Sequence, residues 1–194
     1  YFSANDSLHG TELWASDGTS SGTYLVKDIY SGTNGSAVNN FVIYNNKLYF
    51  SAADSANGNE LWRTDGTDTG TVLVKDINPG IASGFCSGFF VHNGKIFFSA
   101  KVDSTGYEPW ISDGTAQATH MLKDIFPGTG DGYSYGQWCD FNNKLFFSAN
   151  DGVHGFELWE TDGTEAGTDL VIDIYQGHTA SYPLGIVAYH GLMY

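Results

Sequence analysis

A segment of 18 residues recurs four times along the chain, and this recurrence restricts the fold more than any other feature. ELWASDGTSSGTYLVKDI at residues 12–29 returns in variant form at residues 60–77, 108–125 and 157–174, with periods of 48, 48 and 49 residues. Periods of about 40 to 50 residues that contain strand patterns are typical of propellers and stacked arrays. We therefore expect one repeat array over residues 1–194, with approximate repeats at 31–78, 79–126 and 127–175 and partial repeats at 1–30 and 176–194.

Each repeat has the pattern of four antiparallel strands. In the second repeat, two apolar runs surround the dipeptide NN, which suits a two-residue hairpin turn, and turns rich in Gly and Asp separate two further runs. The expected strands are Phe41–Tyr44, Lys47–Ala52, Glu60–Thr64 and Thr71–Ile77. Leu61 and Trp62 are adjacent and must point to opposite faces, so both faces should be buried. The predicted fold is all-β, a β-propeller-like array of four-stranded antiparallel blades.

A tryptophan follows two residues after the first glutamate of the 18-residue segment in every repeat. The four residues are Trp14, Trp62, Trp110 and Trp159. Their recurrence at one strand depth favours a core position between blades, and a platform that faces a ligand is the alternative. In a core position each would contribute several kcal/mol, since Trp→Ala in a core costs about 3–5 kcal/mol.

The segments ELWASDGTSSGT, ELWRTDGTDTGT and ELWETDGTEAGT resemble the ELWxxDGT repeat, found in tandem in secreted or surface-attached, largely bacterial proteins. The resemblance covers all four repeats. It implies an extracellular or cell-surface location and a β-propeller-like fold, but no chemistry. The third repeat departs from the pattern with Pro109 in place of Leu and AQAT in place of xxGT, so we expect its turn to differ.

The charge of the chain limits its partners. Eight basic and 22 acidic residues give a formal net charge of −14, which would repel phosphate backbones and anionic membrane surfaces. No apolar run approaches the roughly 18 residues of a membrane span. We therefore expect neither nucleic acid as a partner nor membrane insertion.

Three loops read D-x-x-x-G-x-E, and oxygen ligands on a loop bent at Gly are what calcium binds in proteins. Carboxylates that only cap solvated turns are the alternative. His9 and His154 occupy one position of these loops, and we interpret them as polar turn residues. The candidate metal ligands are Asp6, Glu12, Asp54, Glu60, Asp151 and Glu157.

The link into the fourth repeat, FPGTGDGYSYGQWCD, contains the one insertion between repeats and concentrates aromatic residues. Variable loops on a rigid frame often carry recognition, so Tyr133, Tyr135 and Trp138 are candidate ligand-binding residues. Cys86 and Cys139 lie at different depths of their repeats, which favours two buried free thiols over a disulfide.

The acidic residues argue against catalysis. Of the 22 carboxylates, 16 fall in four columns repeated once per repeat, whereas an enzyme gathers its acid, base or nucleophile in one place. We expect a non-catalytic structural or adhesive scaffold of an extracellular surface or fibre, with other copies of the array or surface polysaccharide as partners. The alternative is a carbohydrate-binding, lectin-like module, assisted by calcium.

The two ends of the sequence fall inside one strand of the repeat. YHGLMY at residues 189–194 aligns with YNNKLY at 44–49, and YFSA at residues 1–4 aligns with YFSA at 49–52. We therefore expect the 194 residues to be a window on a longer array, with a closed four-bladed ring as the alternative.

Overall fold

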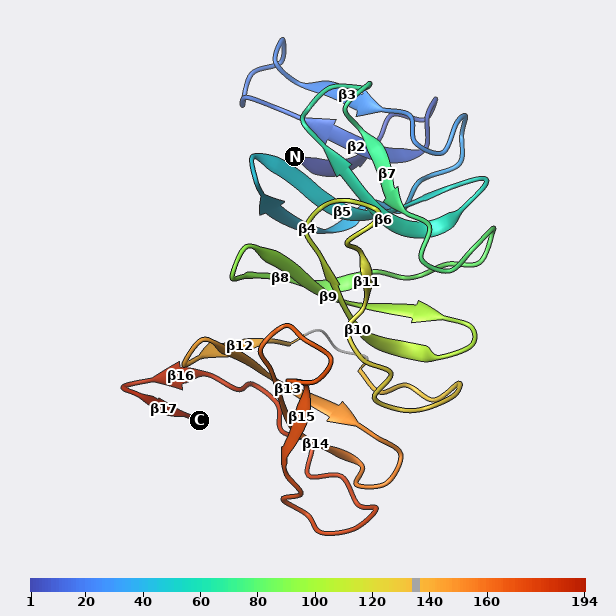
Figure 1. The fold of residues 1–194 in the computed structure, drawn as a ribbon. Helices are drawn as coiled ribbons and strands as arrows, with labels where there is room; N and C mark the ends of the chain where they lie inside the picture. The colour runs from blue at the N-terminus through green and yellow to red at the C-terminus, as the bar shows by residue number, and fades with distance from the viewer. Residues whose placement is uncertain (134–136) are drawn as a thin grey trace. The chain divides into compact units, whose positions relative to one another are not determined.

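A computed structural model describes residues 1–133 and 137–194 of the chain. Within these residues all regular structure is β-strand, and no helix is long and apolar enough to cross a membrane. The chain divides into two compact units, Tyr1–Cys86 and Ser87–Tyr194. The boundary falls in the link between the last strand of one sheet and the first strand of the next (Figure 1).

The first compact unit contains two antiparallel sheets (Figure 1). One has three strands in the order β1-β2-β3, and the other has four in the order β4-β5-β6-β7. Consecutive strands are neighbours, as short turns between antiparallel strands require. The strands are β1 (Phe2–Asn5), β2 (Thr11–Ala15), β3 (Tyr24–Lys27), β4 (Asn39–Tyr44), β5 (Lys47–Asp54), β6 (Gly58–Thr64) and β7 (Val72–Lys75).

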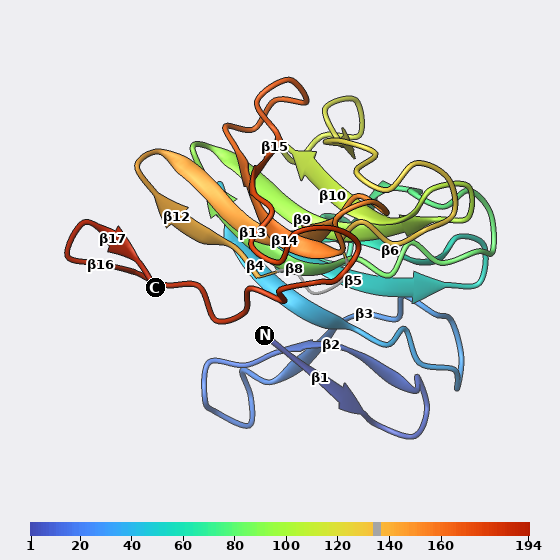
Figure 2. The same ribbon diagram turned by 90° about the horizontal axis from the view of Figure 1, so that it is seen from below.

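The second compact unit contains two four-stranded antiparallel sheets, β8 to β11 and β12 to β15, and a terminal hairpin of β16 and β17. The hairpin contacts β12 and forms a two-stranded sheet of its own (Figure 2). The strands are β8 (Ser87–His92), β9 (Lys95–Val102), β10 (Gly106–Ser112), β11 (His120–Met121), β12 (Cys139–Phe141), β13 (Lys144–Asn150), β14 (Phe156–Thr161), β15 (Asp169–Ile172), β16 (Ala188–Tyr189) and β17 (Leu192–Met193).

The sequence therefore predicts the four-stranded antiparallel sheets correctly. In the second repeat β6 begins two residues earlier than expected and β7 is shorter than Thr71–Ile77. The NN turn between β4 and β5 places Asn45 at φ 48° and Asn46 at φ 57°, the left-handed conformation that this type of hairpin needs. The corresponding turns have the same property, at Asn93 and Gly94, Asn142 and Asn143, and His190 and Gly191.

A β-bulge recurs between the third and fourth strands of a repeat. In β6 and β7, Leu61 is opposite Lys75 and Trp62 is opposite Leu73, so Val74 is the extra residue. The same shift occurs beside β3 and β15, where Val26 and Val171 are the extra residues. A bulge re-aims the inserted side chain. In the first compact unit it directs Val26 into the core.

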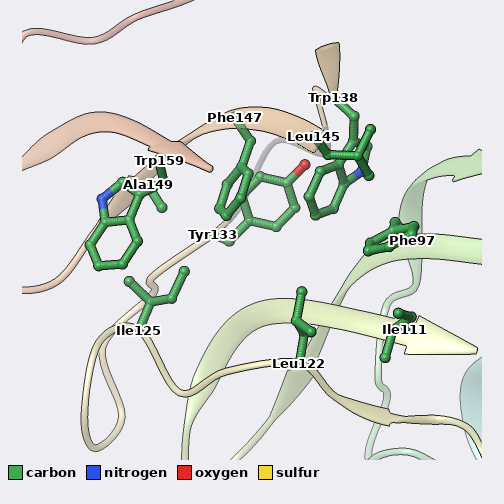
Figure 3. Packing of buried hydrophobic residues seen from close by; sticks show 10 residues of the cluster. All are labelled: Phe97, Ile111, Leu122, Ile125, Tyr133, Trp138, Leu145, Phe147, Ala149 and Trp159. Atoms are coloured by element: carbon green, nitrogen blue, oxygen red, sulfur yellow. The ribbon is translucent and has the colours of Figure 1, made fainter. Parts of the chain in front are cut away.

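The sheets of each compact unit share one hydrophobic core. In the first compact unit Leu13 and Val26 come from the sheet of β1 to β3, and Phe50 and Trp62 come from the sheet of β4 to β7. In the second, Ile111 and Leu122 lie opposite residues of β13 and β14 (Figure 3). The predicted core position is confirmed for Trp62, Trp110 and Trp159, with exposed fractions of 6%, 7% and 6%. Trp14 is half-buried.

Candidate functional site

The glutamate that opens the 18-residue segment is fully buried in all four repeats. Glu12, Glu60, Glu108 and Glu157 each have an exposed fraction of 0%. Glu60, on β6, accepts hydrogen bonds from the backbone N–H groups of Ile77 (2.8 Å), Asn78 (3.4 Å) and Gly84 (2.7 Å).

The donors to the other three glutamates lie at matching places in the link after the fourth strand. Each glutamate thus pins that link to its sheet. A buried carboxylate needs such donors, because an unpaired one would cost several kcal/mol.

The electrostatic setting of this glutamate differs between repeats. Burial raises the pKa of Glu60 to about 7 and that of Glu108 to about 8, and backbone N–H donors counteract only part of this effect. Burial also raises the pKa of Glu157, but donors that include the Ser181 hydroxyl at 2.5 Å outweigh it, so the pKa of Glu157 lies below its ordinary value. Glu60 and Glu108 have glycine, Gly84 and Gly132, where Glu157 has Ser181. The serine alone does not lower the pKa, because Glu12 has Ser36 at this place and burial still raises its pKa.

The aspartate of each D-x-x-x-G-x-E loop caps its own turn. Asp6 accepts the N–H groups of Leu8 (3.0 Å) and His9 (2.8 Å), and its other oxygen lies 2.6 Å from Nδ1 of His9. Asp151 has the same arrangement with His154, at 2.7 Å. The hydrogen bond that His9 donates to the Asp6 carboxylate raises the pKa of His9 and lowers the pKa of Asp6 to about 2. These two ion pairs were not predicted, although the i,i+3 spacing of their residues is visible in the sequence.

Asp54 follows the same pattern with an amide in place of the imidazole. Its Oδ1 accepts the N–H groups of Ala56 and Asn57, and its Oδ2 lies 2.9 Å from Nδ2 of Asn57. The three aspartates predicted to bind calcium thus have both oxygens in hydrogen bonds within their own loops.

The glycine of the same loops permits a close approach of backbone. A Cβ atom on Gly58 would lie 2.5 Å from the carbonyl oxygen of Ala82, and one on Gly10 would lie 2.1 Å from that of Asn34. Both carbonyls belong to the link that the buried glutamate pins. Each defining residue of the D-x-x-x-G-x-E motif therefore has a structural function. Asp caps the turn, Gly permits the close approach of the link, and Glu accepts hydrogen bonds from the link.

The calcium prediction receives no support from this geometry. The oxygens of Asp6, Asp54 and Asp151 accept hydrogen bonds from their own loops, and those of Glu12, Glu60 and Glu157 accept them from the links. In residues 1–133 and 137–194, no group of three or more His, Cys, Asp or Glu side chains is arranged to hold a metal ion.

The DGT turn is a hydrogen-bonded unit of its own. Oδ1 of Asp65 accepts from the N–H (3.0 Å) and hydroxyl (2.7 Å) of Thr67, and these bonds lower the pKa of Asp65. The hydroxyl of Thr71 donates to the carbonyl of Thr67 at 2.7 Å. The hydroxyls of Thr71 and Thr64 lie 2.7 Å apart, where the chain returns to the sheet. Equivalent bonds occur in the other three repeats.

The third repeat keeps the DGT turn despite its departure from the motif. Thr115 still bonds Asp113, but the N–H of Ala118 lies 3.3 Å from the Thr115 hydroxyl, against 2.9 Å for Gly70 and Thr67. The strand that follows, β11, has only two residues. The expectation that the turn itself differs was therefore wrong in its hydrogen bonds, and the difference lies in the strand after the turn.

Two of the three predicted ligand-binding residues lie in the core. Tyr133 is 1% exposed and Trp138 is 9% exposed, and their ring centroids are 4.8 Å apart (Figure 3). Both pack on Phe147, so neither presents a ring face to solvent. Tyr135 lies outside the described residues. Cys86 and Cys139 are buried free thiols, as expected.

A pocket on the sheet of β12 to β15 was not predicted. Its volume is about 300 Å³, and it is lined by Gln137, Ser148, Phe156, Tyr182 and Leu184. The rings of Phe156 and Tyr182 are stacked, with centroids 5.7 Å apart and an interplanar angle of 21°. Within the described residues the buried hydroxyl of Ser148 has no hydrogen-bond partner, whereas the equivalent Ser99 donates to the carbonyl of Tyr133. A stacked aromatic pair beside one unpaired hydroxyl suits a small polar ring as ligand.

Comparisons with known proteins give little further information. No protein-family model matches the sequence, and no curated protein matches it. Among solved structures, the chain is similar to the crystal structure of the computationally designed Ika8 protein, with a TM-score of 0.43 and 13% identity over 91% of this chain and 49% of that one. The chain thus spans about half the length of that protein, and a likeness this weak carries no argument about fold or function.

Proposed function

We propose that this chain is a non-catalytic structural or adhesive scaffold of an extracellular surface or fibre. One observation supports the proposal: the residues that recur in every repeat form hydrogen bonds or core contacts within the fold. The buried glutamate pins the link, the DGT aspartate closes the turn, and three of the four tryptophans are buried. These recurring residues are therefore explained by their structural function, and no catalytic function is needed to explain them.

We further propose that the sheets are blades of a β-propeller-like array. Within each compact unit, two antiparallel sheets contribute apolar side chains to one core. Such packing of sheet on sheet through radial repetition also protects strand edges. The resemblance of the four segments to the ELWxxDGT repeat agrees with this arrangement and with a location outside the cell. The partners proposed are other copies of the array.

Carbohydrate binding is the second candidate, and the Phe156–Tyr182 pocket favours it. Aromatic rings stack on the apolar faces of sugar rings, and hydroxyl and amide groups bond the sugar hydroxyls. The pocket offers the Ser148 hydroxyl and the side chain of Gln137, whose Oε1 already accepts from the N–H of Gly185 at 3.2 Å. A volume of about 300 Å³ is at the lower end for small-molecule sites and would hold one sugar ring.

A glycan array with the labelled chain tests the two functions against each other. The scaffold proposal predicts no specific signal at micromolar protein. One sugar bound specifically, with binding lost in Tyr182→Ala and kept in Tyr189→Ala, would overturn it in favour of the lectin-like function. Tyr189 is a suitable control because its ring is 64% exposed and is not among the pocket residues.

A further inference from the structure

Three departures from the repeat pattern meet at the hairpin turns of the second compact unit. His92 precedes the turn between β8 and β9, at a position where the other repeats have tyrosine or phenylalanine. The turn itself reads Asn93–Gly94, whereas the turns before and after it read NN. Asp140 lies two residues before the next such turn, at a position that is apolar in the other repeats. Unlike the repeated carboxylates, these groups occur once and lie in one place.

The side chains of Asp140, His92 and Asn93 form one hydrogen-bonded series. Nδ1 of His92 lies 3.0 Å from Oδ2 of Asp140, and Nε2 of His92 lies 2.9 Å from Nδ2 of Asn93. A carboxylate only accepts, so Nδ1 of the neutral ring carries the hydrogen and Nε2 accepts from the Asn93 amide. His92 is 6% exposed, and its ring packs edge-on against Phe97. A basic nitrogen is therefore held beside the amide nitrogen of Asn93.

The Asn93–Gly94 dipeptide is suited to attack by its own backbone. In an Asn-Gly pair the backbone nitrogen of the glycine can reach the asparagine side chain, because glycine has no Cβ to hinder the approach. Both residues are exposed, which gives water access to them. A Cβ atom on Gly94 would meet nothing within 4 Å, so this side of the turn is open. There is space at the turn for a five-membered ring to form.

We propose that Asn93 is a site of self-catalysed deamidation, with His92 as the proton carrier and Asp140 as the positioning residue. The backbone nitrogen of Gly94 bonds to Cγ of Asn93, and its proton passes through water to Nε2 of His92. The imidazolium, stabilised by Asp140, gives this proton to Nδ2 as the Cγ–Nδ2 bond breaks and ammonia leaves. Water then opens the succinimide to aspartate or isoaspartate. The proposal does not depend on the scaffold function.

Deamidation changes a contact between two sheets of this compact unit. Nδ2 of Asn93 also donates to Oδ1 of Asn143, at 3.1 Å, which joins the turn of β8 and β9 to the turn of β12 and β13. A carboxylate at position 93 has no hydrogen to donate there, and it adds a second negative charge near Asp140. The reaction therefore removes one tie between the two sheets, and the loss of ammonia makes the change irreversible.

Peptide mapping by mass spectrometry during incubation near pH 7 and at about 37 °C tests the proposal. The chain contains two other Asn-Gly dipeptides, at Asn34 and Asn57, which serve as internal controls. The Asn57 amide bonds to the carboxylate of Asp54 rather than to an imidazole. Because a positioned acid and base contribute about a hundredfold or more, Asn93 should convert at least about tenfold faster than either control.

Variants of the series separate proton transfer from packing. His92→Gln keeps a hydrogen-bonding side chain but carries no proton, so conversion at Asn93 should fall to the rate at Asn34. His92→Tyr should do the same in a chain that folds normally, because Tyr44 occupies this position in the second repeat. Asp140→Asn should slow conversion, and Asp140→Glu, which keeps the carboxylate, should restore part of the rate.

Three outcomes overturn the proposal. One is a rate at Asn93 in wild type that is no higher than the rate at Asn34. Another is an unchanged rate at Asn93 in both His92 variants when their circular dichroism matches that of wild type. The third is a product that contains aspartate without isoaspartate, because attack by the Gly94 nitrogen passes through a succinimide that opens to both.

Discussion

The sheet of β4 to β7 and the sheet of β12 to β15 share one sequence motif but differ in burial and charge. Both have the NN turn, the DGT turn and the buried glutamate. Ile77 is 4% exposed and Ile174 is 55% exposed, and the pKa of Glu60 is raised to about 7 whereas that of Glu157 is lowered. The motif therefore determines hydrogen bonding within a sheet, while the surroundings of the sheet determine burial and the pKa of the glutamate.

The largest effect is expected where a core tryptophan is removed. Trp62→Ala should lower the free energy of unfolding by about 3–5 kcal/mol, because it empties a buried aromatic site. Trp14→Ala should cost less, because Trp14 is half-buried. Urea unfolding followed by circular dichroism measures both. A loss below about 1 kcal/mol for Trp62→Ala would contradict its core position and favour a ligand platform.

The two isoleucines test the comparison of the sheets directly. Ile77→Ala should cost about 2–5 kcal/mol, the range for a buried isoleucine, whereas Ile174→Ala should cost less than about 1 kcal/mol in the monomer. Thermal and urea unfolding at low protein concentration and low salt keep association out of the measurement. Equal losses would show that Ile174 is covered to the same extent as Ile77.

The pH dependence of stability should separate the glutamates. An acid whose pKa is raised by folding binds its proton more tightly when folded, so its contribution is present below its ordinary value of 4.5 and is lost as the pH rises. The loss runs from about pH 4.5 to about pH 7 for Glu60 and from about pH 4.5 to about pH 8 for Glu108, and it is complete above these values. Glu157 has the opposite sign: its pKa is lowered, so its contribution is present above pH 4.5 and is lost as the pH falls.

Unfolding measured from pH 5 to pH 9 should therefore show wild-type stability falling, with a shallower slope in Glu60→Gln and an unchanged slope in Glu157→Gln. In the His9 and His154 pairs the imidazole donates to an aspartate, which raises the imidazole pKa, so these pairs also lose stability as the pH rises. They are present in all three proteins and cancel in the comparison. A slope in Glu60→Gln equal to that of wild type would contradict the raised pKa of Glu60.

The smallest effect is expected from metal. The loop aspartates accept hydrogen bonds from their own loops, so millimolar calcium should leave the melting temperature of the chain equal to that in chelator. A ligand that binds the folded state would raise it by mass action. A rise of several degrees with calcium would support the calcium prediction, and loss of that rise in Asp151→Asn would locate the site.

Much of the fold could be predicted because it depends on local patterns. The NN turns require positive φ, which Asn tolerates, and the strands between turns are rich in apolar and β-branched residues. The role of the buried glutamate could not be predicted, because its hydrogen-bond donors lie 17 to 24 residues later. Whether it binds these backbone donors or a metal depends on the path of the link, which has no local sequence pattern.

The ligand-binding predictions depended on exposure, which the sequence does not encode locally. Tyr133 and Trp138 lie in a link that varies between repeats, yet the variation places aromatic rings in a core rather than on a surface. The Phe156–Tyr182 pocket depends on Tyr182 in a left-handed conformation, at φ 49°, and on the unpaired hydroxyl of Ser148. Both properties arise from the path of the link and have no local pattern.

Hydrogen exchange in the link after β7 tests most directly whether the repeated residues serve architecture. In wild type the amides of Ile77 and Asn78 should be protected, because they donate to the buried carboxylate of Glu60. In Glu60→Ala we expect these two amides to lose protection by at least tenfold, while β5 and β6 keep theirs and Gly84, which also donates to the carbonyl of Asn59, loses less. Unchanged protection in the link, with the fold intact, would contradict the account.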